Sequence, residues 1–343
     1  MPVDQARATV AIVGATGAVG REALAVLAGR GHPADRVIPL ASARSAGEVI
    51  EYGSESVKVR ELPAIGFPAC DVAIFCATAG IAQDAGPRAV ASGALVIDNS
   101  SAFRMDPSVP LVVPEINADS IGQARLIANP NCSTIILLTA LNPIRKKFGV
   151  SRVVVSTYQA VSGAGIEAVR ELESQTRDVL DGKPALPKVL PQACAFNVFS
   201  HESTIDEATG FNGEEAKMIA ESGRIWAGEP FELIPTCVRV PVMRAHTQSA
   251  MVTLASPATE AELLETLEGA PGVTVVEDRA SNRFPTPLQA TGGEGVLAGR
   301  IRCFSPTECG VLIAGDQLRK GAALNAIQIM DHVLTGTSAR IPG

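Results

Sequence analysis

One cysteine lies where the sequence predicts the start of an apolar helix. The residues Asn129-Pro130-Asn131 precede Cys132, and their composition ends the strand before it. A thiol at a helix start feels the positive end of the helix dipole, which favours the thiolate. A thiolate is a suitable nucleophile for acyl transfer, because the thioester that it forms accepts a hydride readily. Position alone still favours a buried structural cysteine, so the assignment needs a partner.

The chain has four histidines that could serve as this partner. His32, in a turn before a proline, and His332, on the final predicted helix, are expected at the surface. His201 lies in an irregular stretch. His246 follows the segment RVPVMRA at the end of a predicted strand, where side chains converge on a cleft. We therefore expect His246 to be the acid/base group, the alternative being an ordinary loop histidine.

A glycine-rich turn joins the first predicted strand to the first predicted helix. Its sequence, GATGAVG, places Gly14, Gly17 and Gly20 three residues apart. Glycines let the backbone approach a pyrophosphate, and the helix start presents free N–H groups to it. The turn predicts a dinucleotide site, although a tight strand–helix turn without a ligand would have the same sequence.

The residues after the second predicted strand favour NADP over NAD. An NAD enzyme would carry Asp or Glu about twenty residues beyond the glycine turn, to bind the ribose hydroxyls. This chain instead has Ser42 and Arg44 in the segment ASARS. A hydroxyl and a guanidinium suit a 2′-phosphate, which arginine can bind through two hydrogen bonds. The alternative for Arg44 is a loop cation in solvent.

Two groups of elements must position these residues. Residues 1–130 alternate buried strands (9–13, 37–40, 71–76, 94–98) with helices (19–30, 82–92), which predicts a Rossmann-type doubly wound parallel sheet, an α/β fold. Residues 131–315 combine longer alternating strands (152–159, 232–242, 249–255, 297–304) with helices (134–148, 166–180, 213–226, 260–267). This predicts an α+β catalytic and oligomerisation domain with a mixed sheet. Segment 316–343, with a helix at 321–334, is expected to complete the first domain. Residues 181–191, rich in proline and lysine, predict a projecting arm or a plain surface loop.

Composition excludes several classes of protein. The net charge is −7, aromatic residues make up 4%, and residues 145–147 form the one short basic run, which argues against nucleic-acid binding. The longest apolar stretch, 135–141, is far shorter than the roughly 18 residues that span a bilayer, so no membrane segment is expected. The seven cysteines form no CxxC pair. We therefore expect no metal site and a cytoplasmic location with reduced thiols.

Eight motifs resemble those of the aspartate-semialdehyde dehydrogenases, in family order and across almost the whole chain. They are VGATGAVG (13–20), ASARSAG (41–47), NSSAFR (99–104), NPNCST (129–134), YQAVSGAG (158–165), GEEAKM (213–218), RVPVMRAH (239–246) and GDQLRKGAALNAIQI (315–329). The N-acetyl-glutamyl-phosphate reductases share the architecture but differ around the cysteine, and Asn131-Cys132-Ser133 is similar to the aspartate enzymes. A non-catalytic NADP-sensing regulator is a further alternative, which leaves Cys132, His246 and Arg239 unexplained.

The resemblance implies a reaction, its substrates and an assembly. The reaction is the NADPH-dependent reductive dephosphorylation of L-aspartyl 4-phosphate to L-aspartate 4-semialdehyde through a cysteine thioester. It belongs to lysine, threonine, methionine and diaminopimelate biosynthesis. The partners are aspartyl phosphate, aspartate semialdehyde and phosphate, and the chain is expected to form a homodimer or homotetramer.

The resemblance also implies a role for particular residues. Cys132 is the nucleophile, His246 the acid/base group, and Gln159 orients the substrate carbonyl. Arg239 binds the α-carboxylate, Glu214 the α-ammonium, and three residues hold the phosphate, namely Arg104, Asn131 and Lys217. The cofactor-binding residues are Gly14, Thr16, Gly17, Ala18, Val19, Gly20, Ser42, Arg44, Thr78, Ser162, Gly163 and Asn325. The chain departs from common forms of the family at Thr247-Gln248, after the histidine, and at residues 303–309. The second departure affects local packing rather than chemistry.

Overall fold

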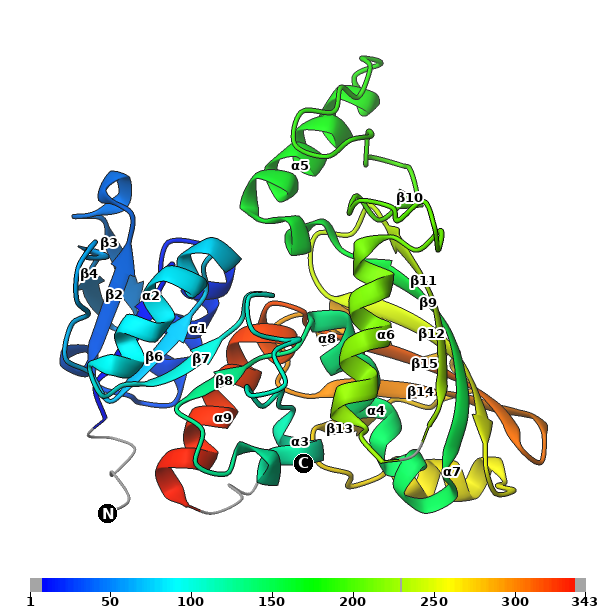
Figure 1. The fold of residues 1–343 in the computed structure, drawn as a ribbon. Coiled ribbons are helices and arrows are strands. Elements are labelled where there is room, and N and C mark those ends of the chain that lie inside the picture. Colours follow the sequence, from blue (N-terminus) through cyan, green and yellow to red (C-terminus); the bar gives the residue numbers. More distant parts are fainter. Residues whose placement is uncertain (1–7, 229, 337–343) are drawn as a thin grey trace. The chain divides into compact units, whose positions relative to one another are not determined.

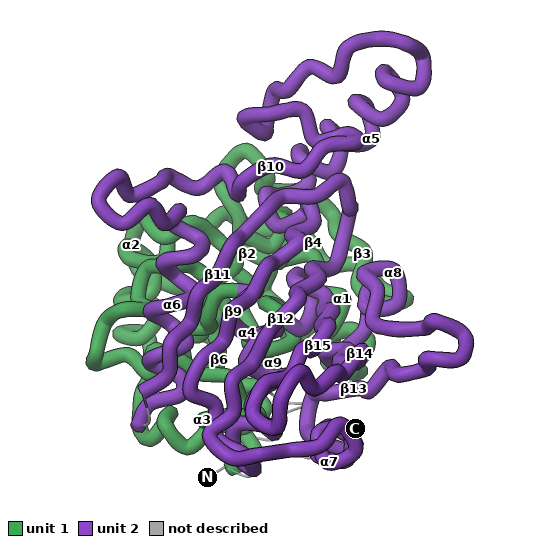
Figure 2. Tube along the Cα trace, turned by 90° about the vertical axis from the view of Figure 1, so that its right-hand side faces the viewer, with its two compact units in different colours: residues 1–131, 321–340 green, residues 132–320, 341–343 purple. Residues whose placement is uncertain are grey.

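The chain folds into two compact units. The computed structural model describes residues 8–228 and 230–336. Unit 1 comprises residues 1–131 and 321–340, and unit 2 comprises residues 132–320 and 341–343 (Figure 2). The expected boundary at residues 130 and 131 lies one residue from this division, and the expected return at 316 lies five residues before it. The last seven residues of the expected C-terminal segment lie outside the described residues.

Unit 1 is built on a six-stranded parallel sheet (Figure 1). Its strand order is β5-β2-β1-β6-β7-β8, formed by β1 (Val10–Val13), β2 (Val37–Ala41), β5 (Arg60–Glu61), β6 (Val72–Phe75), β7 (Leu95–Asp98) and β8 (Leu126–Ala128). A separate hairpin pairs β3 (Val49–Tyr52) with β4 (Glu55–Lys58). The helices are α1 (Ala18–Gly29), α2 (Ala79–Ala91), α3 (Pro114–Asn117) and α9 (Leu324–Thr335). The predicted doubly wound parallel sheet is confirmed.

Alternate side chains of β1 pack against helices on the two faces of this sheet. Val10 and Ile12 pack in one core cluster with residues of α1 and α9, whereas Ala11 and Val13 pack in a second cluster with α2. A strand buried on both faces reads as a continuous apolar run, which is why this segment shows no polar alternation. The α9 helix contacts α1, α3 and β7, so the end of the described chain packs within unit 1.

Unit 2 contains a seven-stranded mixed sheet of order β10-β11-β9-β12-β15-β14-β13. Its strands are β9 (Val150–Gln159), β10 (Phe199–Ser200), β11 (Glu232–Arg239), β12 (His246–Leu254), β13 (Val273–Val275), β14 (Val296–Ser305) and β15 (Glu308–Gly315). The helices are α4 (Cys132–Phe148), α5 (Ile166–Leu180), α6 (Gly213–Ile225), α7 (Glu260–Leu267) and α8 (Pro287–Ala290). The mixed sheet of the second domain is therefore confirmed.

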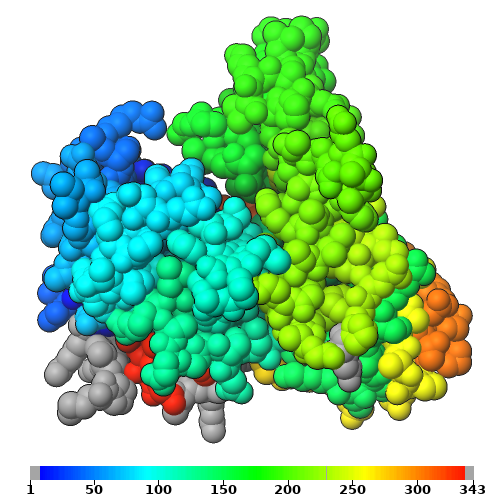
Figure 3. Space-filling view, viewed as in Figure 1, coloured from blue at the N-terminus to red at the C-terminus, as the bar shows by residue number. Residues whose placement is uncertain are grey.

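The segment around α5 projects from the sheet of unit 2, as Figures 1 and 3 show in green. Residues 183–187, which follow α5, have no regular secondary structure, in agreement with the expected arm or loop. A small apolar cluster holds this projection together and includes Ala168, Leu172 and Cys194. Glu171 and Gln175 on α5 accept backbone hydrogen bonds from residues 188–195, which tie the returning chain to the helix.

Some local expectations were wrong. The strand expected at 232–242 ends at Arg239, and β15 occupies residues 308–315, where no strand was expected. The last helix begins with a π-helical turn, Arg319–Ala323, before α9. His32 is buried rather than at the surface, and this burial lowers the pKa of its imidazole.

Candidate active site

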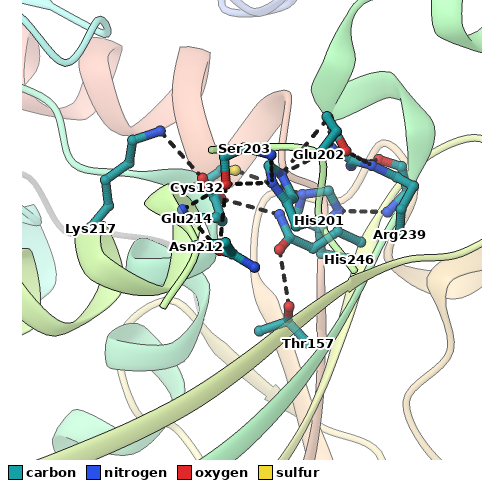
Figure 4. Close-up of polar contacts among 12 residues, drawn as sticks. Cys132, Thr157, His201, Glu202, Ser203, Asn212, Glu214, Lys217, Arg239 and His246 are labelled. Carbon is teal, nitrogen blue, oxygen red and sulfur yellow. Dashed lines mark hydrogen bonds and ion pairs between the residues drawn. The ribbon is translucent and has the colours of Figure 1, made fainter. Parts of the chain in front are cut away.

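Three of the expected catalytic and substrate-binding residues meet at one edge of the unit 2 sheet. The parallel strands β9 and β11 end side by side, with Gln159 paired to Arg239. The neighbouring strand β12 runs antiparallel to β9 and begins at His246. Cys132 is the first residue of α4, as the sequence predicted. The strand ends and this helix start bring the side chains of Cys132, Arg239 and His246 into one cluster (Figure 4).

The thiol of Cys132 faces the imidazole of His246. The Cys132 Sγ atom lies 3.7 Å from His246 Nε2. The backbone N–H of Ala160 donates to His246 Nδ1 at 3.0 Å. A ring nitrogen that accepts a hydrogen bond carries no proton, so the proton of the neutral imidazole lies on Nε2, toward the sulfur. The hydrogen bond from Ala160 thus fixes the tautomer that can donate to a thiolate.

His246 is completely buried, and its surroundings keep it neutral. Loss of hydration, followed by the nearby positive charge of Arg239, lowers the pKa of His246 to about 3. A neutral imidazole whose Nδ1 is occupied can donate through Nε2. It can accept a proton there only after the ring leaves the Ala160 N–H. The described geometry therefore suits a donor toward sulfur or a developing oxyanion, which is the acid half of the acid/base role expected for His246, and the full role stays a prediction.

Arg239 is a buried cation held by several acceptors. Its side chain is 1% exposed. The Nε and Nη2 atoms donate to the two carboxylate oxygens of Glu202, at 3.1 and 2.5 Å. Nη1 donates to the Ala160 carbonyl at 2.6 Å, and Nη2 lies 3.0 Å from His201 Nε2. Although burial acts to raise the pKa of Glu202, the hydrogen bonds and charge of Arg239 hold it below its ordinary value.

A second carboxylate, Glu214, lies at the start of α6. Its Oε1 atom accepts from Gln159 Nε2 at 3.2 Å, and its Oε2 atom lies 3.5 Å from Lys217 Nζ. Asn212 caps this helix and accepts from the backbone N–H groups of Glu214 and Glu215. The cap sets the position of Glu214 because it fixes the first turn of the helix. Glu214, Gln159 and Lys217, which the resemblance assigns to the substrate, thus form one connected set.

Gly163, expected on the cofactor side together with Ser162, lies beside Arg239 and His246. A Cβ atom at Gly163 would be 3.3 Å from Arg239 Nη1 and 3.4 Å from His246 Cε1. Ser162 Oγ accepts a hydrogen bond from Gln317 Nε2, and Gln317 Oε1 accepts from the Ala245 N–H at 2.8 Å. A side chain at Gly163 would thus occupy the space directly against the guanidinium and the imidazole.

The glycine turn of unit 1 has the form that a pyrophosphate requires. Gly14 adopts φ = +84°, and a Cβ atom there would lie 2.5 Å from the Cys76 carbonyl oxygen. A Cβ atom at Gly20 would overlap the Gly14 carbonyl. Gly17 is the N-cap of α1, no side chain caps this helix, and its first turn contains no acidic residue. The backbone N–H groups of residues 18–20, in the first turn of α1, are therefore suited to an anion.

Two further segments of unit 1 carry the other expected cofactor residues. Ser42 is the N-cap of a short 3-10 helix (Ala43–Ser45) that directly follows β2, and its side chain and that of Arg44 are exposed. Thr78 is the N-cap of α2, which follows β6. Both segments begin at the carboxyl ends of parallel strands, the edge at which such sheets bind dinucleotides. The residues present in unit 1 fit NADP.

Three more expected residues are buried in unit 1. Arg104 Nη2 donates to the Asn99 carbonyl at 2.6 Å. Asn131, which directly precedes Cys132 in the chain, is 6% exposed. Asn325 is fully buried, and its amide donates to the carbonyl of Val112 at 3.0 Å and to Asn129 Oδ1 at 2.7 Å. These contacts hold Asn325 in place from the side of its amide nitrogen.

Sequence reasoning assigned no role to several residues of this cluster. Glu202, His201 and Asn212 contact the expected residues directly, as does Gln317. The motif GDQLRKG contained Gln317 and could have indicated it. His201 and Glu202 follow the two-residue strand β10, which gives no periodic signal, so their position depends on long-range pairing with β11.

Cys132 is expected to be the thiol that iodoacetamide alkylates at neutral pH. Burial is the main cause that raises the pKa of the other six thiols, to about 11 for Cys70 and Cys194, to about 12 for three others (Cys76, Cys237, Cys309), and above its ordinary value for Cys303. Alkylation requires the thiolate, and a thiol with a raised pKa forms little thiolate at neutral pH. Peptide mapping by mass spectrometry should find Cys132 as the one modified residue. If another cysteine is labelled before Cys132, the expectation is wrong.

Comparison with known proteins identifies the family. Residues 9–124 match the semialdehyde dehydrogenase NAD-binding domain, and residues 141–320 match the semialdehyde dehydrogenase dimerisation domain. The chain is 44% identical to an aspartate-semialdehyde dehydrogenase of Synechocystis sp. over 326 residues, which covers 94% of this chain and 96% of the relative. It is 41% identical to the enzyme of that name from Bacillus subtilis, over 94% and 96% of the two chains.

The solved structures agree with the sequence relatives. The crystal structure of aspartate semialdehyde dehydrogenase II from Vibrio cholerae superposes with a TM-score of 0.91 at 37% identity, covering 96% of this chain and 98% of that chain. The same enzyme complexed with ASA gives a TM-score of 0.91 at 36% identity. Together with the cysteine and histidine at the sheet edge, these matches show that the chain belongs to the aspartate-semialdehyde dehydrogenase family.

Proposed function

We propose that the chain catalyses the NADPH-dependent reductive dephosphorylation of L-aspartyl 4-phosphate to L-aspartate 4-semialdehyde. The observation that carries this proposal is the 3.7 Å approach of Cys132 Sγ to His246 Nε2, beside a buried arginine and a buried glutamate. This arrangement supports acyl transfer through a thioester. The reaction provides an intermediate for the biosynthesis of lysine, threonine, methionine and diaminopimelate.

The residues of unit 2 divide the chemical work. The thiolate of Cys132 attacks the acyl carbon, and phosphate leaves as the thioester forms. Reduced NADP, when bound, supplies a hydride for the thioester carbonyl. The Nε2–H of His246 stabilises first the thiolate and then the oxygen that gains negative charge. Collapse of the thiohemiacetal anion releases the aldehyde and returns Cys132 as a thiolate, so this half of the cycle requires no proton to be taken up by His246.

Each charged group of the substrate has a proposed partner. Arg239 binds the α-carboxylate, and Glu214 binds the α-ammonium. Gln159 orients the carbonyl that Cys132 attacks. The phosphate is assigned to a set that combines a guanidinium, an amide and an ammonium, namely Arg104, Asn131 and Lys217. The side chains proposed for the phosphate thus carry two positive charges for an anion that is doubly charged in the acyl phosphate.

We assign NADP to the residues that the sequence singled out. The pyrophosphate would be held by the glycine turn, namely Gly14, Thr16, Gly17, Ala18, Val19 and Gly20. Thr78 lies at the start of α2, at the same edge of the sheet. Ser42 and Arg44 would bind the 2′-phosphate, which distinguishes NADP from NAD. Ser162, Gly163 and Asn325 would meet the nicotinamide end. The glycine at position 163 supports this assignment, because a side chain there would occupy the space next to Arg239 and His246.

The reverse reaction tests the proposed function. Purified protein should reduce NADP in the presence of aspartate semialdehyde and phosphate, and omission of phosphate should abolish steady turnover. N-acetyl-glutamate semialdehyde serves as the matched alternative, because its acetylated amine cannot pair with Glu214 as an ammonium does. Faster turnover of the acetylated substrate would assign the chain to the reductases instead, and absence of phosphate-dependent turnover would refute the proposal.

We further propose that two copies of the chain associate through the mixed sheet, as a homodimer that could pair again into a homotetramer. The matched family domain is a dimerisation domain. Val154, Tyr158 and Met251 are between 37% and 44% exposed on neighbouring strands β9 and β12, where Met251 pairs with Val154. A second copy would cover this apolar face, and the mass in solution tests this. No disulfide joins the cysteines, all of which lie among the described residues, and this supports a cytoplasmic location. None of the helices among the described residues is long and apolar enough to span a bilayer.

A further inference from the structure

The guanidinium of Arg239 is almost fully engaged by the protein itself. An arginine has five N–H donors. Glu202 takes two of them in a parallel pair, on Nε and Nη2. His201 Nε2 faces another, and the Ala160 carbonyl accepts a fourth, from Nη1. One Nη1 hydrogen is therefore left without an acceptor among residues 8–228 and 230–336.

A substrate carboxylate that binds Arg239 in a fork needs two N–H donors. One of the present acceptors must therefore leave. The Ala160 carbonyl is fixed, because the N–H of the same residue holds His246. His201 is tied to Ser203, whose Oγ atom lies 3.1 Å from Nδ1. Glu202 is the one acceptor that shares both the charge and the planar shape of a substrate carboxylate.

We propose that Glu202 is an internal carboxylate that occupies Arg239 in the free protein and gives way to the substrate's α-carboxylate. The inference rests on the proposed function, which places this carboxylate on Arg239. The Glu202 side chain is 22% exposed, against 1% for Arg239, so its carboxylate can turn toward water while the guanidinium stays in place. Two carboxylates on a single guanidinium repel each other, so Glu202 leaves Arg239 when the substrate carboxylate binds.

The exchange makes Glu202 a determinant of affinity and specificity. In the free protein it supplies the counter-charge that the buried Arg239 requires. Only a ligand that brings its own carboxylate can replace that counter-charge. A ligand with a carboxamide leaves Glu202 on the arginine and forgoes this contact. The affinity for the substrate therefore depends on the difference in free energy between the Arg239–substrate and Arg239–Glu202 ion pairs. Removal of the Glu202 charge should strengthen substrate binding.

The test measures binding of L-2-aminobutyrate, which has the ammonium and carboxylate of the semialdehyde but no reactive aldehyde. Isothermal titration calorimetry gives its Kd for the wild type and for Glu202→Gln. Loss of the competing charge should lower the Kd roughly tenfold, since hydrogen bonds to charged groups are about twice as strong as neutral ones. The amide of the same ligand should bind with unchanged Kd. Tighter binding cannot arise from structural damage, which separates exchange from a general loss of order.

Glu207→Gln is the matched control. Glu207 is exposed in the same loop, so the variant removes the same charge away from Arg239 and should leave both Kd values unchanged. A Kd for L-2-aminobutyrate that rises or stays the same in Glu202→Gln would overturn the proposal, because Glu202 would then merely position Arg239 or not influence it. Wild-type turnover with semialdehyde and phosphate is measured separately. Its absence would refute the proposed function, whereas the binding comparison concerns Glu202 alone.

Discussion

Replacement of Cys132 by alanine is expected to lower kcat by roughly 10⁴-fold or more, because no covalent intermediate can form without the nucleophile. Binding of NADP should be unaffected, since the glycine turn between β1 and α1 is untouched. Steady-state turnover and fluorescence titration with NADPH measure the two quantities. The two results together separate a loss of chemistry from a loss of cofactor binding.

Cys132→Ser provides the control for size. The hydroxyl nearly preserves the volume of the side chain, but it forms no significant alkoxide at neutral pH, so this variant should be almost as inactive as the alanine variant. If either variant retained more than about a tenth of wild-type kcat, the covalent mechanism would be wrong. Cys303→Ala is the matched cysteine control, because Cys303 lies on β14, and it should keep full activity.

Replacement of His246 by alanine is expected to lower kcat by about 10³-fold, the effect typical of the loss of a donor to a developing oxyanion. His246→Gln should keep at least about tenfold more activity than the alanine variant, because its amide nitrogen can replace the Nε2–H donor. The reason lies in the tautomer that the Ala160 N–H fixes. Steady-state kinetics of the two variants give the comparison.

The pH profile of the wild type checks the same assignment. With a pKa of about 3, His246 stays neutral at every pH above roughly 4, so it should add no step to kcat/KM between pH 5 and 8. A histidine that acted as a base would instead lose activity as the pH fell through its pKa near neutrality. A step near pH 6.5 that disappears in His246→Gln, together with equal activities of the two variants, would establish acid/base catalysis and contradict the donor role.

The sequence predicted the strands β1, β2, β6 and β7 of the parallel sheet to within one residue of their ends, but not β5 and β8. Strands such as β1 and β7 are buried on both faces, so they appear as short apolar runs bounded by glycine or polar residues. The helices α5 and α7 matched their expected bounds, and α7 has a clear start signal, the capping box of Thr259 and Glu262. In these segments the local sequence was sufficient to predict the secondary structure.

The sequence could not predict contacts that depend on strand pairing across long distances. The strand β10 has two residues, and its pairing with β11 brings the next residues, His201 and Glu202, to Arg239. The strand β15 was missed because its sequence, ECGVLIAG, has no regular alternation and lies centrally in the sheet between β12 and β14. His32 was expected at the surface from its turn sequence, but the Tyr52 hydroxyl donates to its carbonyl and the surrounding core covers its ring.

Capture of an acyl group on Cys132 tests the thioester mechanism most directly. The protein is mixed with aspartate semialdehyde and NADP without phosphate, so that the thioester forms but cannot be released by phosphate. We expect a burst of NADPH of about one equivalent per active site and an acyl adduct on the peptide that contains Cys132, with both absent in Cys132→Ala. A burst without an adduct, or an adduct on another residue, would contradict the assignment of Cys132 as the nucleophile.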